Sequence, residues 1–289
     1  MSKYFNETQK TEEWFEQEAL AKRQDVAAII EQLRKPSPGP SSTPTNGNAL
    51  IQPSPYSGRT DLIRGVAATV LNGEKVGHYA MEAYRGLRTQ LMRLQAAKEL
   101  SSVVLSSAMP GEGKTTTILN LGLCYAQLHD SPVLLIDADL RTKRLSQFFE
   151  NSAAPGLAEA LSGLAKYEDV IQRTENPNLY ILTAGTPAGS PPELFVGTAW
   201  AEFIARCKKQ FKMILVDAPP VRPLADFELI CAGCDAFMMV VRAYHTQRDL
   251  LQQIAGQIDP KKLIGVVLNS AEVSSKHAYY YQYGSKANS

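Results

Sequence analysis

The chain has 289 residues, of which 44% are hydrophobic and 20% are charged, and its formal net charge is +1. This composition is typical of a folded globular protein with an ample core, and the near-zero net charge gives no electrostatic reason to expect a nucleic-acid partner. No apolar run reaches the roughly 18 residues that a membrane-spanning helix needs, so no such helix is expected.

The first sixty residues differ in composition from the rest of the chain. Apolar residues recur at near-helical spacing among Glu, Lys and Arg over 11–34, which predicts an amphipathic helix within a segment 1–35. Both a lone solvated helix and a docking helix for a partner fit this pattern. Residues 36–60 are rich in Pro and Ser, have little to bury, and are predicted to be a disordered linker.

A second helical pattern precedes the first predicted strand, in the sequence EAYRGLR. At 100° per residue, Glu82, Arg85 and Arg88 share one face of this helix, and four apolar residues fall roughly opposite: Tyr84, Leu87, Leu91 and Leu94. A plain surface ion pair between Glu82 and Arg85 would also explain the charged face.

From about residue 100, short apolar runs alternate with helical patterns, which indicates βαβ crossovers and a mostly parallel sheet flanked by helices. The predicted strands are 102–107, 133–136, 179–182, 213–216, 236–241 and 263–268. The predicted helices between them are 115–128, 192–209 and 246–258. The fold class is therefore α/β.

The first predicted strand runs into the sequence AMPGEGKTTT, which matches the phosphate-binding pattern G-x-x-x-x-G-K-[ST] except for Ala108 in place of the first Gly. Glycines allow backbone N–H groups to close around phosphate oxygens, and the following helix N-terminus adds partial positive charge. Lys114 can reach the β- and γ-phosphates, and the Thr115 hydroxyl can ligate Mg²⁺. The predicted nucleotide-binding residues here are Gly111, Glu112, Gly113, Lys114, Thr115 and Thr116.

Three aspartates follow two predicted strands. Asp137 and Asp139 come at the end of LLIDADLR, and Asp217 follows four apolar residues in MILVDAPP. A single Asp after a strand is often only a turn former. Three of them, at the carboxyl ends of strands in a sheet that carries a phosphate loop, predict a cluster that supplies a base and holds a metal.

Four cysteines are scattered through the domain, at Cys124, Cys207, Cys231 and Cys234. The last two form a CxxC pair, but no second pair or nearby His completes a zinc site. We expect buried, reduced thiols, which suit a reducing cytosol.

These motifs carry a resemblance to the bacterial tyrosine kinases, the autokinases of capsule and exopolysaccharide systems. AMPGEGKTTT, DADLR and VDAPP resemble the family's Walker A, Walker A′ and Walker B motifs, and EAYRGLR resembles its ExxRxxR element. The similarity extends over about residues 78–284. It implies a P-loop tyrosine kinase domain over 75–275 and a flexible Tyr-rich tail over 276–289.

The resemblance implies a role for each site residue, with ATP and Mg²⁺ as cofactors. Asp137 is expected to be the base that takes the phenol proton, and Lys114 to neutralise charge on the phosphates. Asp139 and Asp217 are expected to hold Mg²⁺ with Thr115, and Asn269 to contact the adenine.

The tail holds the expected phosphoacceptors, Tyr279, Tyr280, Tyr281 and Tyr283. By resemblance they would be phosphorylated in trans within a ring of identical subunits, and Glu82, Arg85 and Arg88 would lie at the subunit interface. Without a membrane segment, the chain resembles the split type of kinase, which is expected in the cytoplasm. A separate transmembrane activator of the polysaccharide co-polymerase type would recruit it to the inner face of the membrane, and a tyrosine phosphatase would oppose it.

Two other interpretations remain open. A nucleotide-switch ATPase of the septum-placement and partition type would hydrolyse ATP without making phosphotyrosine. It is disfavoured because Met109 stands where that subgroup carries an extra lysine. In the other interpretation, the tail is a docking strand at a sheet edge and the nucleotide is structural.

Overall fold

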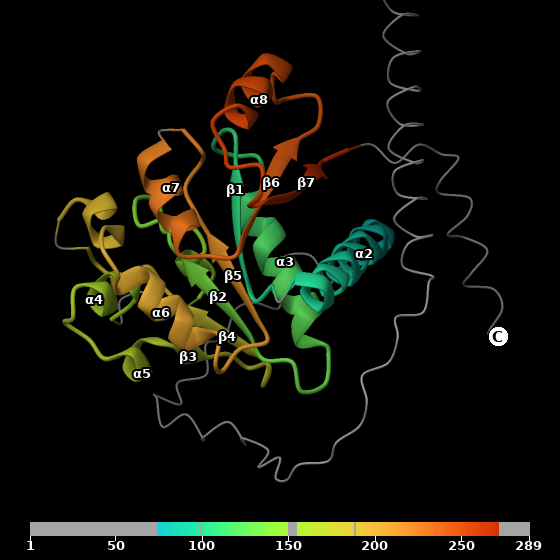
Figure 1. Cartoon of the computed structure of the whole chain (residues 1–289). Helices are drawn as coiled ribbons and strands as arrows, with labels where there is room; N and C mark the ends of the chain where they lie inside the picture. The colour runs from blue at the N-terminus through green and yellow to red at the C-terminus, as the bar shows by residue number, and fades with distance from the viewer. Residues whose placement is uncertain (1–73, 99, 150–154, 188, 223, 272–289) are drawn as a thin grey trace, which may run out of the picture. The chain divides into compact units, whose positions relative to one another are not determined.

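The computed structural model describes residues 74–98, 100–149, 155–187, 189–222 and 224–271 (Figure 1). The predicted amphipathic segment 1–35, the linker 36–60 and the Tyr-rich segment 276–289 lie outside these residues. What the structure describes is an α/β domain built on one mostly parallel sheet, as the sequence predicts.

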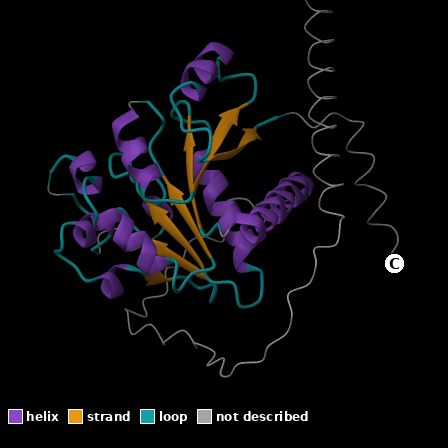
Figure 2. Cartoon of the chain, viewed as in Figure 1, coloured by secondary structure: helices purple, strands orange, loops and turns teal. Residues whose placement is uncertain are grey.

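The sheet has seven strands in the order β3-β4-β2-β5-β1-β6-β7 (Figures 1 and 2). The strands are β1 (Ser102–Ser107), β2 (Val133–Asp137), β3 (Gln172–Arg173), β4 (Leu179–Leu182), β5 (Met213–Asp217), β6 (Ala236–Arg242) and β7 (Leu263–Asn269). All neighbouring pairs are parallel except β3 with β4. Each of the six strands that the sequence predicts is confirmed within one residue at each end.

Helices connect the strands. They are α2 (Glu74–Lys98), α3 (Lys114–Ala126), α4 (Leu157–Leu161), α5 (Tyr167–Val170), α6 (Ala199–Cys207), α7 (Leu224–Ala232) and α8 (Arg248–Ala255), with 3₁₀ turns η2 (Ser146–Phe148) and η3 (Pro191–Phe195). Among the described residues, none of these helices is both long enough and apolar enough to cross a bilayer.

Strand alternation divides the core between the two faces of the sheet. Val103 and Leu105 of β1 pack in a cluster with α2 and α3, whereas Val104 between them packs in a cluster with α6 and α7. Figure 1 shows α2 and α3 on one side of the sheet and the other helices grouped on the opposite side. The four cysteines are buried and free, as predicted.

Helix α2 packs against α3 through the apolar face that the sequence predicts. Leu91 is 2% exposed, and three partly buried residues pack beside it: Tyr84, Leu87 and Leu94. Glu82 and Arg85 of the EAYRGLR element are more exposed, with side chains that are more than a third accessible to solvent.

The predicted helix over 192–209 is wrong in its first half. The structure has the 3₁₀ turn η3 there, and α6 starts only at Ala199. Gly197 between them adopts φ 89°, a left-handed conformation that ends a helical path. The Pro191–Pro192 pair favours a short turn because proline lacks the N–H that a helix interior needs.

Candidate functional site

The phosphate loop joins β1 to α3 through two glycines with positive φ, Gly111 at 83° and Gly113 at 94°. A Cβ added at Gly113 would lie 2.1 Å from the side-chain nitrogen of Asn269, and the left-handed φ would itself strain any larger residue there. Helix α3 begins at Lys114 and directs its free N–H groups into the loop. This local geometry is that of an anion cradle, as the motif predicts.

Two of the predicted aspartates are brought together by the register of the sheet. Asp137 of β2 and Asp217 of β5 are direct partners in neighbouring parallel strands. Leu135 and Leu215, two residues earlier in each strand, pack on the face of the sheet that α3 covers. Side chains two residues apart in a strand lie on the same face, so both aspartates face α3 as well. Both carboxyl groups are fully buried next to the start of α3.

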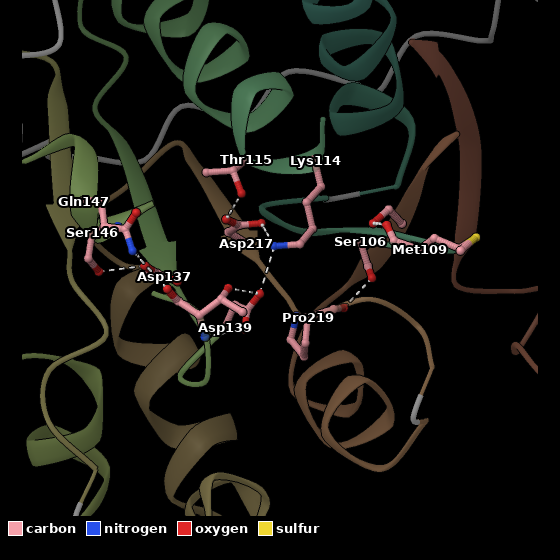
Figure 3. Close-up of polar contacts among 12 residues, drawn as sticks. Ser106, Met109, Lys114, Thr115, Asp137, Asp139, Ser146, Gln147, Asp217 and Pro219 are labelled. Atoms are coloured by element: carbon pink, nitrogen blue, oxygen red, sulfur yellow. Dashed lines mark hydrogen bonds and ion pairs between the residues drawn. The ribbon is translucent and has the colours of Figure 1, made fainter. Parts of the chain in front are cut away.

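Lys114 joins two of the carboxylates (Figure 3). Its Nζ lies 3.0 Å from Asp139 Oδ2 and 3.1 Å from Asp217 Oδ1. Burial works against the lysine's charge, but the carboxylates of Asp217 and Asp139 outweigh it and raise the pKa of Lys114 above its ordinary value. Lys114 is therefore an ammonium ion at neutral pH.

Asp217 also accepts a hydrogen bond from the Thr115 hydroxyl, at 2.7 Å (Figure 3). Burial raises the pKa of Asp217, and the bonds from Lys114 and Thr115 work against that rise. Thr115, the second helical residue of α3, and Asp217 thus lie within one hydrogen bond of each other, as a shared magnesium shell requires.

Asp137 is held by one neighbour and leaves one oxygen unused. Its Oδ2 accepts hydrogen bonds from the backbone N–H of Ser146 at 2.7 Å and from the Ser146 hydroxyl at 2.6 Å. Its Oδ1 is buried and has no hydrogen-bond partner. Burial and the nearby Asp217 raise the pKa of Asp137 to about 7, although the bonds from Ser146 oppose that rise.

Asp139 lies in the tight turn that follows β2. It accepts hydrogen bonds from Thr142, from the backbone N–H at 3.2 Å and from the hydroxyl at 2.7 Å. Arg141, the next charged residue, turns away and binds Asp226 of α7, with its Nε 2.7 Å from the carboxylate. The turn therefore presents Asp139 to Lys114 while Arg141 fastens it to the neighbouring helix.

The donor set suits a hard divalent cation held partly by a ligand. Within the described ranges, no group of three or more His, Cys, Asp or Glu residues is preassembled for a metal. Mg²⁺ commonly takes only one or two carboxylates and completes its shell with water and substrate phosphates. The Thr115 hydroxyl, Asp139, Asp217 and the unpartnered oxygen of Asp137 are all oxygen donors, so these residues fit Mg²⁺.

The remaining predicted nucleotide-binding residues lie in the loop or beside it. Thr116 is half-buried on α3, whereas Glu112 is fully buried with its carboxylate engaged by protein groups. Asn269 ends β7 and donates a hydrogen bond from Nδ2 to the Glu112 carbonyl at 2.8 Å. Its contact with adenine stays a prediction.

The predicted interface residues lie on α2 and behave differently from one another. Arg85 Nη1 lies 2.5 Å from Glu82 Oε1, and both side chains are more than a third exposed. Arg88 donates from Nη1 to the Cys124 carbonyl of α3, also at 2.5 Å. Glu82 and Arg85 are therefore open to a partner, while Arg88 braces the helix pair.

Sequence reasoning missed two residues of this site, Ser146 and Thr246. Ser146 holds Asp137, and the Thr246 hydroxyl binds the Glu112 carboxylate. Neither residue belongs to a spacing pattern, because each reaches the site through the course of a loop. The only signal was a hydroxyl residue in the loop that follows a predicted strand.

Comparisons with known proteins identify relatives of this chain. A family model described as "AAA domain" matches residues 101–260. Over 211 residues the chain is 32% identical to "Tyrosine-protein kinase YwqD" of Bacillus subtilis, covering 72% of this chain and 87% of that protein. Over 206 residues it is 31% identical to "Tyrosine-protein kinase CpsD" of Streptococcus agalactiae, covering 70% and 88%.

A solved structure is also similar to this chain. The chimerical protein CapA2B2 superposes with a TM-score of 0.61 at 30% sequence identity, covering 66% of this chain and 85% of that one.

Proposed function

This chain belongs to the bacterial tyrosine kinases, and we propose from this premise that it transfers the γ-phosphoryl group of ATP to tyrosine hydroxyls of its own C-terminal segment. The acceptors would be Tyr279, Tyr280, Tyr281 and Tyr283, which lie outside the described residues. The proposal is carried by one observation: a buried aspartate, Asp137, pairs in register with Asp217 beside the phosphate loop and keeps one carboxylate oxygen without a hydrogen-bond partner.

Asp137 would act as the general base. A phenol has a pKa near 10 and is protonated at neutral pH, so the proton must leave as the new bond forms. The tyrosine oxygen bonds to the γ-phosphorus, the bond from that phosphorus to the β,γ-bridging oxygen breaks, and ADP departs. The phenolic proton goes to Asp137 Oδ1, the oxygen that Ser146 leaves unused.

Lys114 and the α3 N-terminus would bind the phosphate chain. The Lys114 ammonium group would move from its two carboxylates to the phosphate oxygens and neutralise charge there. Thr115, Asp139 and Asp217 would hold Mg²⁺, which supplies charge neutralisation for the transferring group. The protein thus contributes position and charge rather than a covalent intermediate.

A subunit would phosphorylate its neighbour's tail within a ring, through the exposed Glu82–Arg85 face of α2. Each phosphate adds a charge of about −1.5 to −2, so several on one short segment would repel each other and the aspartates. Phosphorylation would therefore expel the tail and loosen the ring. Such a cycle, reversed by a tyrosine phosphatase and promoted by a membrane-bound activator at the inner face of the membrane, would regulate polysaccharide polymerisation and export.

The test is peptide mass spectrometry after incubation with Mg-ATP, with and without the cytoplasmic segment of a candidate activator. Phosphate on residues 279–283 of the wild type, absent from both Lys114→Met and Asp137→Asn, is the expected result. ATP turnover without any phosphotyrosine in either condition would instead favour the nucleotide-switch ATPase.

A further inference from the structure

Glu112 occupies an unusual position inside the phosphate loop. The residue is fully buried, although Gly111 before it is exposed. Its Oε2 accepts a hydrogen bond from the Met109 backbone N–H at 3.0 Å, and its Oε1 accepts one from the Thr246 hydroxyl. With the carbonyl held by Asn269, this one residue joins the loop to two other segments.

Those two segments follow the neighbouring strands. Thr246 lies in the turn after β6, and Asn269 is the last residue of β7. They are themselves tied together, because the N–H of Ala243 donates to the Asn269 carbonyl at 2.9 Å and the N–H of Arg242 donates to the Thr246 hydroxyl at 3.2 Å. The carboxyl ends of β1, β6 and β7 therefore form one hydrogen-bonded unit centred on Glu112.

The order of the sheet gives a direction to a nucleotide bound in the loop. The aspartates that would hold the metal and take the proton lie at the carboxyl ends of β5 and β2, to one side of β1. In ATP the sugar and base are at the opposite end from the γ-phosphate, so they must extend to the other side of β1. That side is formed by β6 and β7, where Thr246 and Asn269 lie.

We propose that Glu112, Thr246 and Asn269 form a latch that couples the nucleoside end of the bound nucleotide to the phosphate loop. A nucleoside resting on the turn after β6 and on the end of β7 fixes Thr246 and Asn269. Glu112 passes that constraint to the loop N–H groups that hold the phosphates. These are positioning residues, which act through the loop, and the inference rests on the nucleotide binding of the proposed function.

The chemistry of Glu112 explains why a carboxylate stands here. A carboxylate only accepts hydrogen bonds, and both groups that face it, an N–H and a hydroxyl, can donate. A glutamine could keep its oxygen on the Met109 N–H only by turning its NH₂ group to the Thr246 hydroxyl oxygen, so the negative charge that strengthens both bonds would be lost. Valine at position 246 would remove the bond from the hydroxyl and leave the loop sequence unchanged.

Calorimetric titration with ATP and with inorganic tripolyphosphate, both with Mg²⁺, tests the coupling. Only ATP can engage the latch, because tripolyphosphate has no nucleoside. Glu112→Gln and Thr246→Val should each weaken ATP about 10-fold more than they weaken tripolyphosphate, the effect of one hydrogen bond to a charged group. Thr246→Ser keeps the hydroxyl and should restore the wild-type ratio of the two affinities.

The controls separate this coupling from general damage. Glu168→Gln, at an exposed position of α5, should change neither affinity. Equal losses for both ligands, or no loss for either, in a Thr246→Val protein that melts like the wild type, would overturn the latch. A wild type that binds ATP but makes no phosphotyrosine would contradict the kinase function instead and would leave the latch measurable.

Discussion

Ser146 donates both its backbone N–H and its hydroxyl to the same oxygen of Asp137, at 2.7 and 2.6 Å, and leaves the other oxygen without a partner. The Ser146 hydroxyl in turn accepts the N–H of Ala184 at 2.9 Å, so the serine is itself fixed from the loop after β4. Asp137 therefore cannot rotate freely, and the direction of its free oxygen is set by the fold.

Replacing Asp137 with Asn should abolish the base and keep the shape. We expect tyrosine phosphorylation to fall about 10²- to 10⁴-fold, the usual contribution of a general base. ATP affinity should change little, because Lys114 and the loop N–H groups remain. Mass spectrometry of phosphotyrosine measures the activity, and calorimetric titration measures the ATP affinity. Asp169→Asn, at an exposed position of α5, is the matched control. Unchanged phosphorylation would remove Asp137 from the mechanism.

The pKa of Asp137, raised by burial to about 7, predicts the pH dependence of the wild type. The base works only when it is deprotonated, so phosphorylation should rise as the pH increases through about 7. Initial rates at saturating ATP between pH 5.5 and 8.5 give the profile. A rate that is flat across this window would contradict the assignment.

The buried carboxyl group of Asp137 should also make the folded protein less stable as the pH rises. Its pKa in the folded chain lies above the ordinary value, so the folded state binds the proton more tightly than the unfolded chain does. The stability that this proton contributes is present below about pH 4 and is lost as the pH rises toward about 7. The free energy of unfolding of Asp137→Asn, measured relative to that of the wild type, should therefore increase by about 2–3 kcal/mol between pH 5 and pH 8. Urea unfolding at both values tests this, and a constant difference would refute it.

Lys114→Met should destabilise the protein as well as inactivate it. The change leaves Asp139 and Asp217 buried without their cation, which typically costs about 3–5 kcal/mol. Lys208→Met is the comparison, because its ion pair with Asp235 is partly exposed and worth about 1 kcal/mol or less. Thermal unfolding of the two variants should rank them in this order, and equal losses would mean that the buried pair does not stabilise the fold.

Substitutions of Arg85 and Arg88 on α2 should distinguish an effect on subunit assembly from an effect on folding stability. Arg85 has only a surface partner, so Arg85→Ala should change stability by about 1 kcal/mol or less and yet reduce the oligomer mass in light scattering. Arg88→Ala should lower the melting temperature as well, because it removes the bond to the Cys124 carbonyl. An Arg85→Ala protein that assembles like the wild type would place the interface elsewhere.

Much of this architecture could be predicted because local pattern and global fold agree. The buried strands consist of short apolar runs, and the apolar face of α2 follows helical spacing. The phosphate loop and the three aspartates can be proposed from the sequence because each lies at or just after a strand end, and a parallel sheet brings such ends together.

Other elements carry no such signal. Strand β3 has two residues and pairs antiparallel only because β4 lies beside it. Helix α7 was missed because Leu224–Ala232 is mostly apolar and lacks a polar face that would reveal its period. The contacts of Ser146 and Glu112 depend on loop paths, and the sequence specifies those only together with the finished sheet.

The position of β1 has a consequence for how the protein is made. The strand that carries the phosphate loop ends at Ser107, but its two neighbours in the sheet, β5 and β6, begin at Met213 and Ala236. More than a hundred further residues must leave the ribosome before this strand can pair on either side. Such long-range pairing is slow to form and leaves apolar strands exposed meanwhile. The nucleotide site is therefore among the last parts of a nascent chain to assemble, and chaperones would meet it while β1 is still unpaired.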